Sequence, residues 1–120
     1  MRIQSYKDLI VWQKSIDLVC EIYRITKLLP KEEQYGLCNQ MQRAAVSIAS
    51  NIAEGKARNY EKEFAKFLSI AQGSHAELET QIHICVRLEY LTDEQVKIAT
   101  NLCIQIGRML NTLISAVNSK

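Results

Sequence analysis

Apolar residues recur at spacings of three and four along most of the chain, and this periodicity constrains the fold more than any other feature. Near the start, one such series consists of Leu9, Trp12, Ile16, Val19 and Tyr23. Side chains spaced in this way share one face of an α-helix, whereas a half-buried β-strand alternates apolar and polar residues. The sequence contains no sustained alternation. It therefore predicts an all-α protein.

The periodic pattern divides into four segments, which we expect to be helices. They cover about residues 5–29, 35–56, 60–90 and 93–117. We expect Pro30 to end the first helix, Gly55 to end the second and Asn59 to cap the third. Thr92 and Gln95 match a capping box for the fourth. Four such helices with short connections predict an antiparallel up-down four-helix bundle, with the whole chain as one domain.

The first helix carries more apolar surface than a place in a bundle requires. Ser5 and Asp8 match a capping box at its start. Besides the series above, a second apolar stripe lies about 120° around the helix and consists of Val11, Leu18, Ile22, Ile25 and Leu29. We expect the first series to face the core of the bundle and the second stripe to face another chain.

The second helix contains a segment of little bulk, RAAVSIASNIAEG at residues 43–55, in which seven of thirteen residues are Ala, Ser or Gly. Its expected core face is Leu37, Met41, Ala45, Ile48 and Ile52. Small residues allow close approach of helices on two sides, which predicts a homo-oligomer, either a closed ring or a dimer. The predicted oligomer interface comprises Val11, Leu18, Ile22, Ile25, Val46, Ala49 and Ala53. A monomer with a broad core is the alternative.

The same segment has a polar strip. Its members are Arg43, Ser47, Ser50, Asn51 and Glu54. Arg43 and Glu54 are eleven residues apart, about 16 Å along a helix, so they cannot pair directly. We interpret the strip first as a buried or interfacial polar network that sets the register of the helices, and second as a ligand surface.

The chain offers little catalytic chemistry. His75, Glu79 and His83 would share one face of the third helix, but ligands from a single helix rarely form an evolved metal site. Ser74 is next to His75, but adjacent residues of a helix point about 100° apart and do not form a triad. Nothing assigns acid, base or nucleophile roles, so we predict no metal, no cofactor and no enzymatic activity. Four isolated cysteines and no signal peptide or membrane-spanning run favour a cytoplasmic protein with reduced thiols.

A short basic segment is the best candidate for binding a ligand. Within GKARNYEKEFAKF, residues 55–67, the candidate nucleic-acid contacts are Lys56, Arg58, Lys62 and Lys66, with Arg43 secondary. Aromatic residues Tyr60 and Phe64 are interleaved with them. The net charge of +2 neither demands nor excludes nucleic acid. The alternative is a solvated turn with Tyr60 and Phe64 in the core.

Three segments resemble a known family. They are YKDLIVWQKS (6–15), EEQYGLCNQMQRAAVSIASNIAEG (32–55) and EFAKFLSIAQGSHAELETQI (63–82). They are similar to the four-helix-bundle proteins encoded in intervening sequences of bacterial 23S ribosomal RNA genes. The resemblance implies an up-down bundle, commonly a ring-shaped homopentamer, and no catalytic residues. It also implies kinship with accessory proteins of diversity-generating retroelements, and thereby binding of nucleic acid and a reverse transcriptase through a basic surface.

The chain departs from the family pattern at two places. Gln42 stands where the family usually has the first Arg of Arg-Arg-Ala-Ala, which removes one expected positive charge. Glu89 stands where the family usually has the Gly of Leu-Gly-Tyr, so the usual stop of the third helix is missing. We expect an oligomeric scaffold that binds RNA or another nucleic acid. The alternative is a protein-interaction adaptor, for example to a reverse transcriptase-like partner, without nucleic-acid binding of its own.

Overall fold

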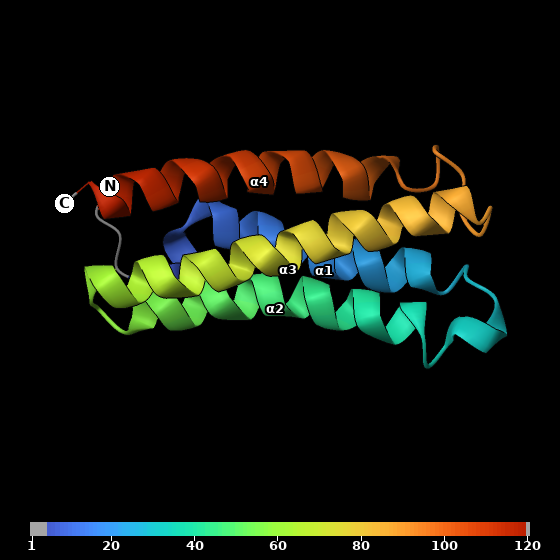
Figure 1. The fold of residues 1–120 in the computed structure, drawn as a ribbon, viewed down its shortest axis with the longest axis horizontal. Coiled ribbons are helices and arrows are strands. Elements are labelled where there is room, and N and C mark those ends of the chain that lie inside the picture. Colours follow the sequence, from blue (N-terminus) through green and yellow to red (C-terminus); the bar gives the residue numbers. More distant parts are fainter. Residues whose placement is uncertain (1–4, 120) are drawn as a thin grey trace.

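A computed structural model describes residues 5–119, whose long helices lie along an axis about 45 Å in extent. Its long helices are α1 (Ile10–Thr26), α2 (Leu37–Ala57), α3 (Glu61–Arg87) and α4 (Lys97–Asn118). Two 3-10 helices precede α1 and α2, namely η1 (Tyr6–Asp8) and η2 (Lys31–Glu33). Successive helices run up and down along the long axis (Figure 1). No strand occurs within the described residues, and the all-α, four-helix prediction is confirmed.

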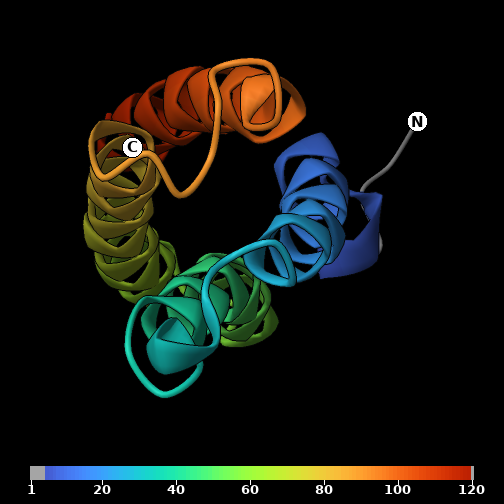
Figure 2. The same ribbon diagram turned by 90° about the vertical axis from the view of Figure 1, so that its right-hand side faces the viewer.

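The four helices surround a common core, which Figure 2 shows end-on. Four of the five residues predicted for the core face of α2, Met41, Ala45, Ile48 and Ile52, are fully buried. The fifth, Leu37, is partly buried and packs against the core. In α3 and α4 the buried apolar side chains again follow spacings of three and four: Phe64, Leu68, Ala71, Leu78, Ile82 and Cys85, and then Ala99, Cys103, Ile106 and Leu110. Burial of these faces is what drives the helices together.

The second apolar stripe of α1 faces the chain's own core, contrary to the prediction, while the first series is divided: Leu9, Trp12 and Val19 pack against the core from its edge. Leu18, Ile22 and Ile25 are fully buried in the chain's own core, and Val11 is 4% exposed. Ile16 and Tyr23, from the series expected to face the core, are 37% and 44% exposed. The assignment of Val11, Leu18, Ile22 and Ile25 to an oligomer interface is therefore wrong. Periodicity finds both stripes, but only the positions of α2 and α4 decide which one points between them.

Both predicted capping boxes are present, but neither caps a long helix directly. Each lies in a short segment that precedes one. Ser5 Oγ accepts from the Lys7 amide at 3.1 Å, while Asp8 accepts from the Ser5 amide; this box caps η1, and α1 begins at Ile10. Thr92 and Gln95 exchange hydrogen bonds of 2.9 and 3.1 Å just before α4. The boxes satisfy amides that would otherwise lack partners.

Three other boundary predictions are wrong. Pro30 does not end α1, which stops at Thr26, and Pro30 instead precedes η2. Gly55 does not end α2, which continues to Ala57. Asn59 does not cap α3; it has a positive φ of 62° and follows the end of α2, while Tyr60 is the residue before α3. Asparagine tolerates the left-handed conformation, so Asn59 takes the terminating role expected of glycine.

Gly55 serves packing between α2 and α3, the helix pair with the most extensive contact. A Cβ atom on Gly55 would lie 2.6 Å from Cβ of Phe67, which is too close for any side chain. The neighbouring small residues Ala44 and Ala49 are also buried, at 4% and 5% exposure. The small residues of segment 43–55 thus bring α2 close to α3 within one chain.

The loop after α3 forms without the usual glycine. Glu89 adopts a positive φ of 62°, and the amides of Tyr90 and Leu91 both donate to the carbonyl oxygen of Cys85. Tyr90 then donates its hydroxyl hydrogen to Glu33 Oε2 at 3.0 Å, which ties this loop to η2. A bulky residue in the left-handed region costs about 1 kcal/mol or more relative to glycine. These contacts offset that cost.

None of the helices within residues 5–119 combines the length and hydropathy that a membrane span needs.

Candidate nucleic-acid interface

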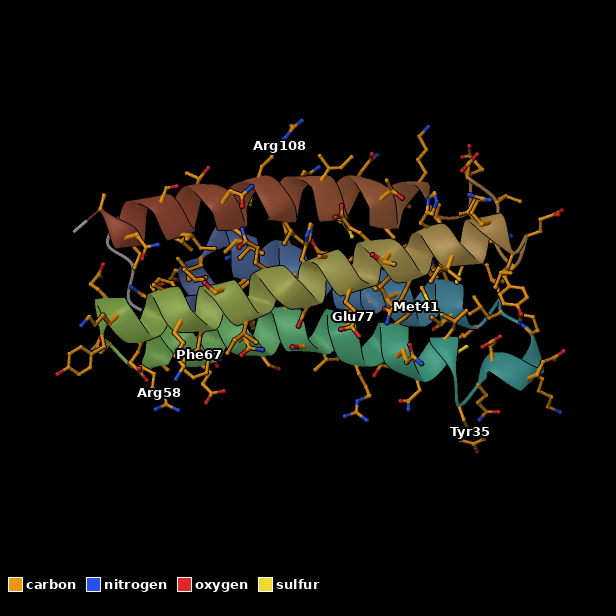
Figure 3. All side chains as sticks on the ribbon, in the orientation of Figure 1. Tyr35, Met41, Arg58, Phe67, Glu77 and Arg108 are labelled. Carbon is orange, nitrogen blue, oxygen red and sulfur yellow. The ribbon has the colours of Figure 1, made fainter. Side chains whose placement is uncertain are left out.

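The basic segment lies at the α2–α3 end of the bundle, and we call this surface the basic turn. It comprises Lys56, Arg58, Tyr60, Lys62 and Lys66. Lys56 belongs to the last turn of α2, while Lys62 and Lys66 belong to the first turns of α3. Figure 3 shows Arg58 beside Phe67 at this end. The tight α2–α3 packing around Gly55 therefore brings four cations of two helices onto one end of the molecule.

Arg58 is the most constrained cation of the basic turn. Its guanidinium is 3.1 Å from a carboxylate oxygen of Glu54 and 3.8 Å from one of Glu63. It also lies over the Phe67 ring, 5.2 Å from the centroid. Its charge is already partly balanced, so Arg58 orders the turn more than it attracts an anion.

The lysines are freer. Lys56 Nζ lies over the Phe64 ring at 5.6 Å from the centroid. Lys62 and Lys66 are exposed, and within the part of the chain that the structure describes neither forms an ion pair. An unpaired exposed lysine can meet a phosphate without first breaking another contact. Lys62 and Lys66 are therefore the strongest candidates for contacts to an anionic ligand.

Tyr60 lies on the surface, contrary to the alternative that placed both aromatic residues in the core. It is 71% exposed, whereas Phe64 is 6% exposed and does belong to the core. Arg58, Tyr60, Lys62 and Glu63 line a surface hollow of about 450 Å³. An exposed aromatic ring between cations is the arrangement on which single-stranded nucleic acids stack.

Arg43 is not part of the basic turn. It lies fifteen residues before Arg58 on α2, about 22 Å along the helix. It instead lines a separate hollow beside Tyr23 and Val46. The two sets of predicted nucleic-acid contacts are therefore separated.

The polar strip of α2 is divided between different partners. Asn51 Nδ2 donates to the carbonyl and hydroxyl oxygens of Ser47 at 2.8 and 3.0 Å. Ser47 Oγ is 2.8 Å from Ser74 Oγ on α3, so this pair bridges two helices of the same chain. Glu54 pairs with Arg58 instead.

Two members of that strip are outside the network. The side chains of Arg43 and Ser50 are exposed, and neither forms a side-chain hydrogen bond among the described residues. The sequence analysis did not assign Ser74 to this network. The sequence feature that could have identified it is its small polar side chain, which lies opposite Ser47 when α2 and α3 pack antiparallel. On the apolar strip of α2, Ala49 is 5% exposed, so Val46 and Ala53 are the members left at the surface.

The histidines of α3 lie in different environments. His75 is 9% exposed, and its Nε2 lies 2.6 Å from the carbonyl oxygen of Cys103 on α4. Because a carbonyl only accepts, Nε2 carries the hydrogen. His75 Nδ1 is 3.7 Å from Glu79, while His83 is exposed. No group of three metal-binding side chains occurs within residues 5–119.

Two buried thiols are poor nucleophiles. Burial raises the pKa of Cys85 to about 11 and that of Cys103 to about 12. Since the thiolate is the reactive form, both side chains stay protonated near neutral pH. They act as small apolar core residues.

The family model of the 23S rRNA-intervening sequence protein matches residues 7–112, which is most of the chain. The chain belongs to this family. The fold comparison agrees: a crystal structure from Bacteroides thetaiotaomicron, described as a protein with unknown function from the S23 ribosomal protein family, is similar with a TM-score of 0.81 at 27% identity. The match covers 88% of this chain and 98% of that one. The comparison with curated proteins finds no match.

Proposed function

We propose that this member of the 23S rRNA-intervening sequence protein family is a non-enzymatic scaffold that binds RNA through the basic turn. The observation that carries the proposal is the exposed ring of Tyr60, which borders a hollow lined also by Arg58 and Lys62. A tyrosine exposed to this extent gains little from the core, and stacking on a base would cover it.

The charges favour contact with the phosphate backbone rather than with bases. Lys62 and Lys66 are one helical turn apart on α3, so their ammonium groups can meet neighbouring phosphates. Glu61 and Glu63 flank Lys62 in sequence and limit the net positive charge. Binding through a few lysines weakens as salt rises, because each counterion released from the RNA gains less entropy when it enters a more concentrated salt solution.

Assembly would strengthen such a surface. We propose that the scaffold is a homo-oligomer, with a ring-shaped homopentamer favoured by the family resemblance. Each added copy would present one more basic turn, and several weak contacts to one RNA give avidity without any new chemistry.

The test is fluorescence anisotropy of a labelled RNA hairpin with an unpaired loop, titrated with protein at several salt concentrations. We expect saturable binding that falls with salt and is weakened at least about tenfold by Lys62→Glu/Lys66→Glu. Tyr60→Ala should weaken it about fivefold or more.

The matched control is Lys97→Glu/Arg108→Glu, which changes the net charge equally on α4. Arg108 points away from the bundle on the opposite side from Arg58 (Figure 3). Equal losses of RNA affinity in both double variants would mean that only net charge matters, and would refute the basic turn as the RNA-binding surface. A flat titration at low salt would refute RNA binding and leave the adaptor role, with the exposed stripe of Ile16 and Tyr23 as its surface.

A further inference from the structure

A larger hollow lies at the other end of the bundle, between the end of α1, η2 and the start of α2. We call it the α1–α2 groove; its volume is about 710 Å³, within the range of about 300–1,000 Å³ typical of small-molecule sites. It is lined by Tyr23, Thr26, Lys27, Leu29, Pro30, Lys31, Gln34, Tyr35, Cys38, Asn39 and Gln42. Figure 3 shows Tyr35 at this end, far along the bundle from Arg58.

The residues that line the groove carry positive charge. Lys27 and Lys31 are exposed, and the lining contains no acidic residue. Neither lysine forms an ion pair among residues 5–119. Glu32 and Glu33 follow Lys31 in the chain and keep their negative charge, but the two Glu33 oxygens are directed to the Leu37 amide and the Tyr90 hydroxyl. The groove thus offers two free cations, whereas Arg58 of the basic turn is already paired.

Two tyrosines border the same groove. Tyr23 is 44% exposed and Tyr35 is 87% exposed. Tyr23 also lines an adjoining hollow of about 410 Å³ that contains Arg43, so the positive surface continues along α2. Flat aromatic rings left open to water beside cations suit a ligand with a planar ring and an anionic group.

Amide side chains complete the lining. Gln42 Nε2 donates to Thr26 Oγ1 at 3.1 Å, and the Thr26 hydroxyl in turn donates to the Ile22 carbonyl at 2.7 Å. This chain orients the Gln42 amide and leaves its oxygen able to accept. The side-chain amides of Gln34 and Asn39 are exposed, and neither forms a hydrogen bond in the part of the chain that the structure describes. Such amides can read the edge of a nucleobase.

We propose that the α1–α2 groove is a nucleotide site: a base stacks on Tyr35, and Lys27 and Lys31 hold its phosphate. The nucleotide is either a free nucleoside monophosphate or an unpaired nucleotide of a strand, which share the same chemistry. The site is separate from the basic turn and does not depend on RNA binding there.

The test is isothermal titration calorimetry of the full chain with adenosine 5′-monophosphate, and in separate titrations with adenosine, inorganic phosphate and a single-stranded oligoadenylate. We expect the nucleotide to bind more tightly than adenosine or phosphate alone. Tyr35→Ala and Lys27→Ala/Lys31→Ala should each weaken it about fivefold or more. These side chains are exposed, so the variants should melt at the same temperature as the unchanged protein.

The matched control is Lys97→Ala/Arg108→Ala, which removes the same charge from the exposed face of α4 and should leave nucleotide binding unchanged. Binding of the monophosphate identifies a free nucleotide; binding of the oligonucleotide alone, lost in the groove variants, identifies an unpaired nucleotide of a strand. Equal binding of phosphate and nucleotide would overturn the stacking role. The site would be refuted if neither the monophosphate nor the oligonucleotide bound, or if the groove variants bound them as tightly as the unchanged protein. The hairpin titration would still test the basic turn separately.

Discussion

Gly107 lies in the interior of α4, where glycine costs a helix about 1 kcal/mol relative to alanine. The His75 ring accounts for it. A Cβ on Gly107 would lie 2.9 Å from Cε1 of that ring, which reaches across to donate to the Cys103 carbonyl. Because Gly107 has no side chain, His75 of α3 can reach the backbone of α4 and form this hydrogen bond. Gly73, on α3, has nothing within 4 Å of its own Cβ position.

We predict opposite effects of alanine at these two glycines. Gly107→Ala should lower the free energy of unfolding by about 1–2 kcal/mol, because overpacking against His75 outweighs the gain in helix propensity. Gly73→Ala should raise it by about 0.5–1 kcal/mol, because only the propensity changes. Urea unfolding followed by circular dichroism measures both. A loss at Gly73 would contradict the open space beside it and show that another molecule packs there in solution.

At the scale of one element, α1 shows how two apolar stripes divide their roles. The stripe with Leu18 and Ile22 is enclosed by the bundle, while Ile16 and Tyr23 remain accessible. The exposed fractions decide the energetics, since a buried aliphatic side chain loses both its transfer free energy and its packing when it is truncated.

We predict that Ile22→Ala lowers the free energy of unfolding by about 2–5 kcal/mol. Ile16→Ala, the same chemical change one and a half turns earlier, should cost less than about 1 kcal/mol. Thermal and urea unfolding of the two variants in parallel measure the difference. Similar losses would mean that Ile16 is also covered in solution, as it would be in an oligomer that uses this stripe.

At the scale of the whole molecule, the bundle leaves apolar side chains on several of its outer faces. Besides Ile16 and Tyr23 they include Ile70 and Ile84 on α3 and Ile104 on α4, each between 38% and 45% exposed. Such scattered exposure is common on monomers, but it is also what an assembly would cover.

We predict that the protein in solution has a multiple of the 13.7 kDa chain mass, with five times that mass expected for the homopentamer. Size-exclusion chromatography with multi-angle light scattering measures it directly. A mass of one chain over a wide range of concentrations would refute the oligomer and remove the avidity argument for RNA binding.

The sequence by itself determined the class of fold and most of the core face of α2. Spacings of three and four residues are a direct consequence of the helical period, so Met41, Ala45 and Ile48 could be placed in the core without a structure. The basic turn could also be predicted from the sequence, because its cations are close to one another along the chain. Local hydrogen bonding was equally predictable, as the Thr92–Gln95 box shows.

Only the tertiary structure decided the features that depend on what lies opposite a residue. Nothing along the chain distinguishes the stripe of Ile22 from that of Ile16, because both have the same period. The reason for Gly55 is Phe67 and the reason for Gly107 is His75, each on a different helix. The α1–α2 groove likewise joins Tyr23 to Asn39 across a turn. Such contacts arise from helix packing, which places side chains by geometry in space rather than by their spacing in sequence.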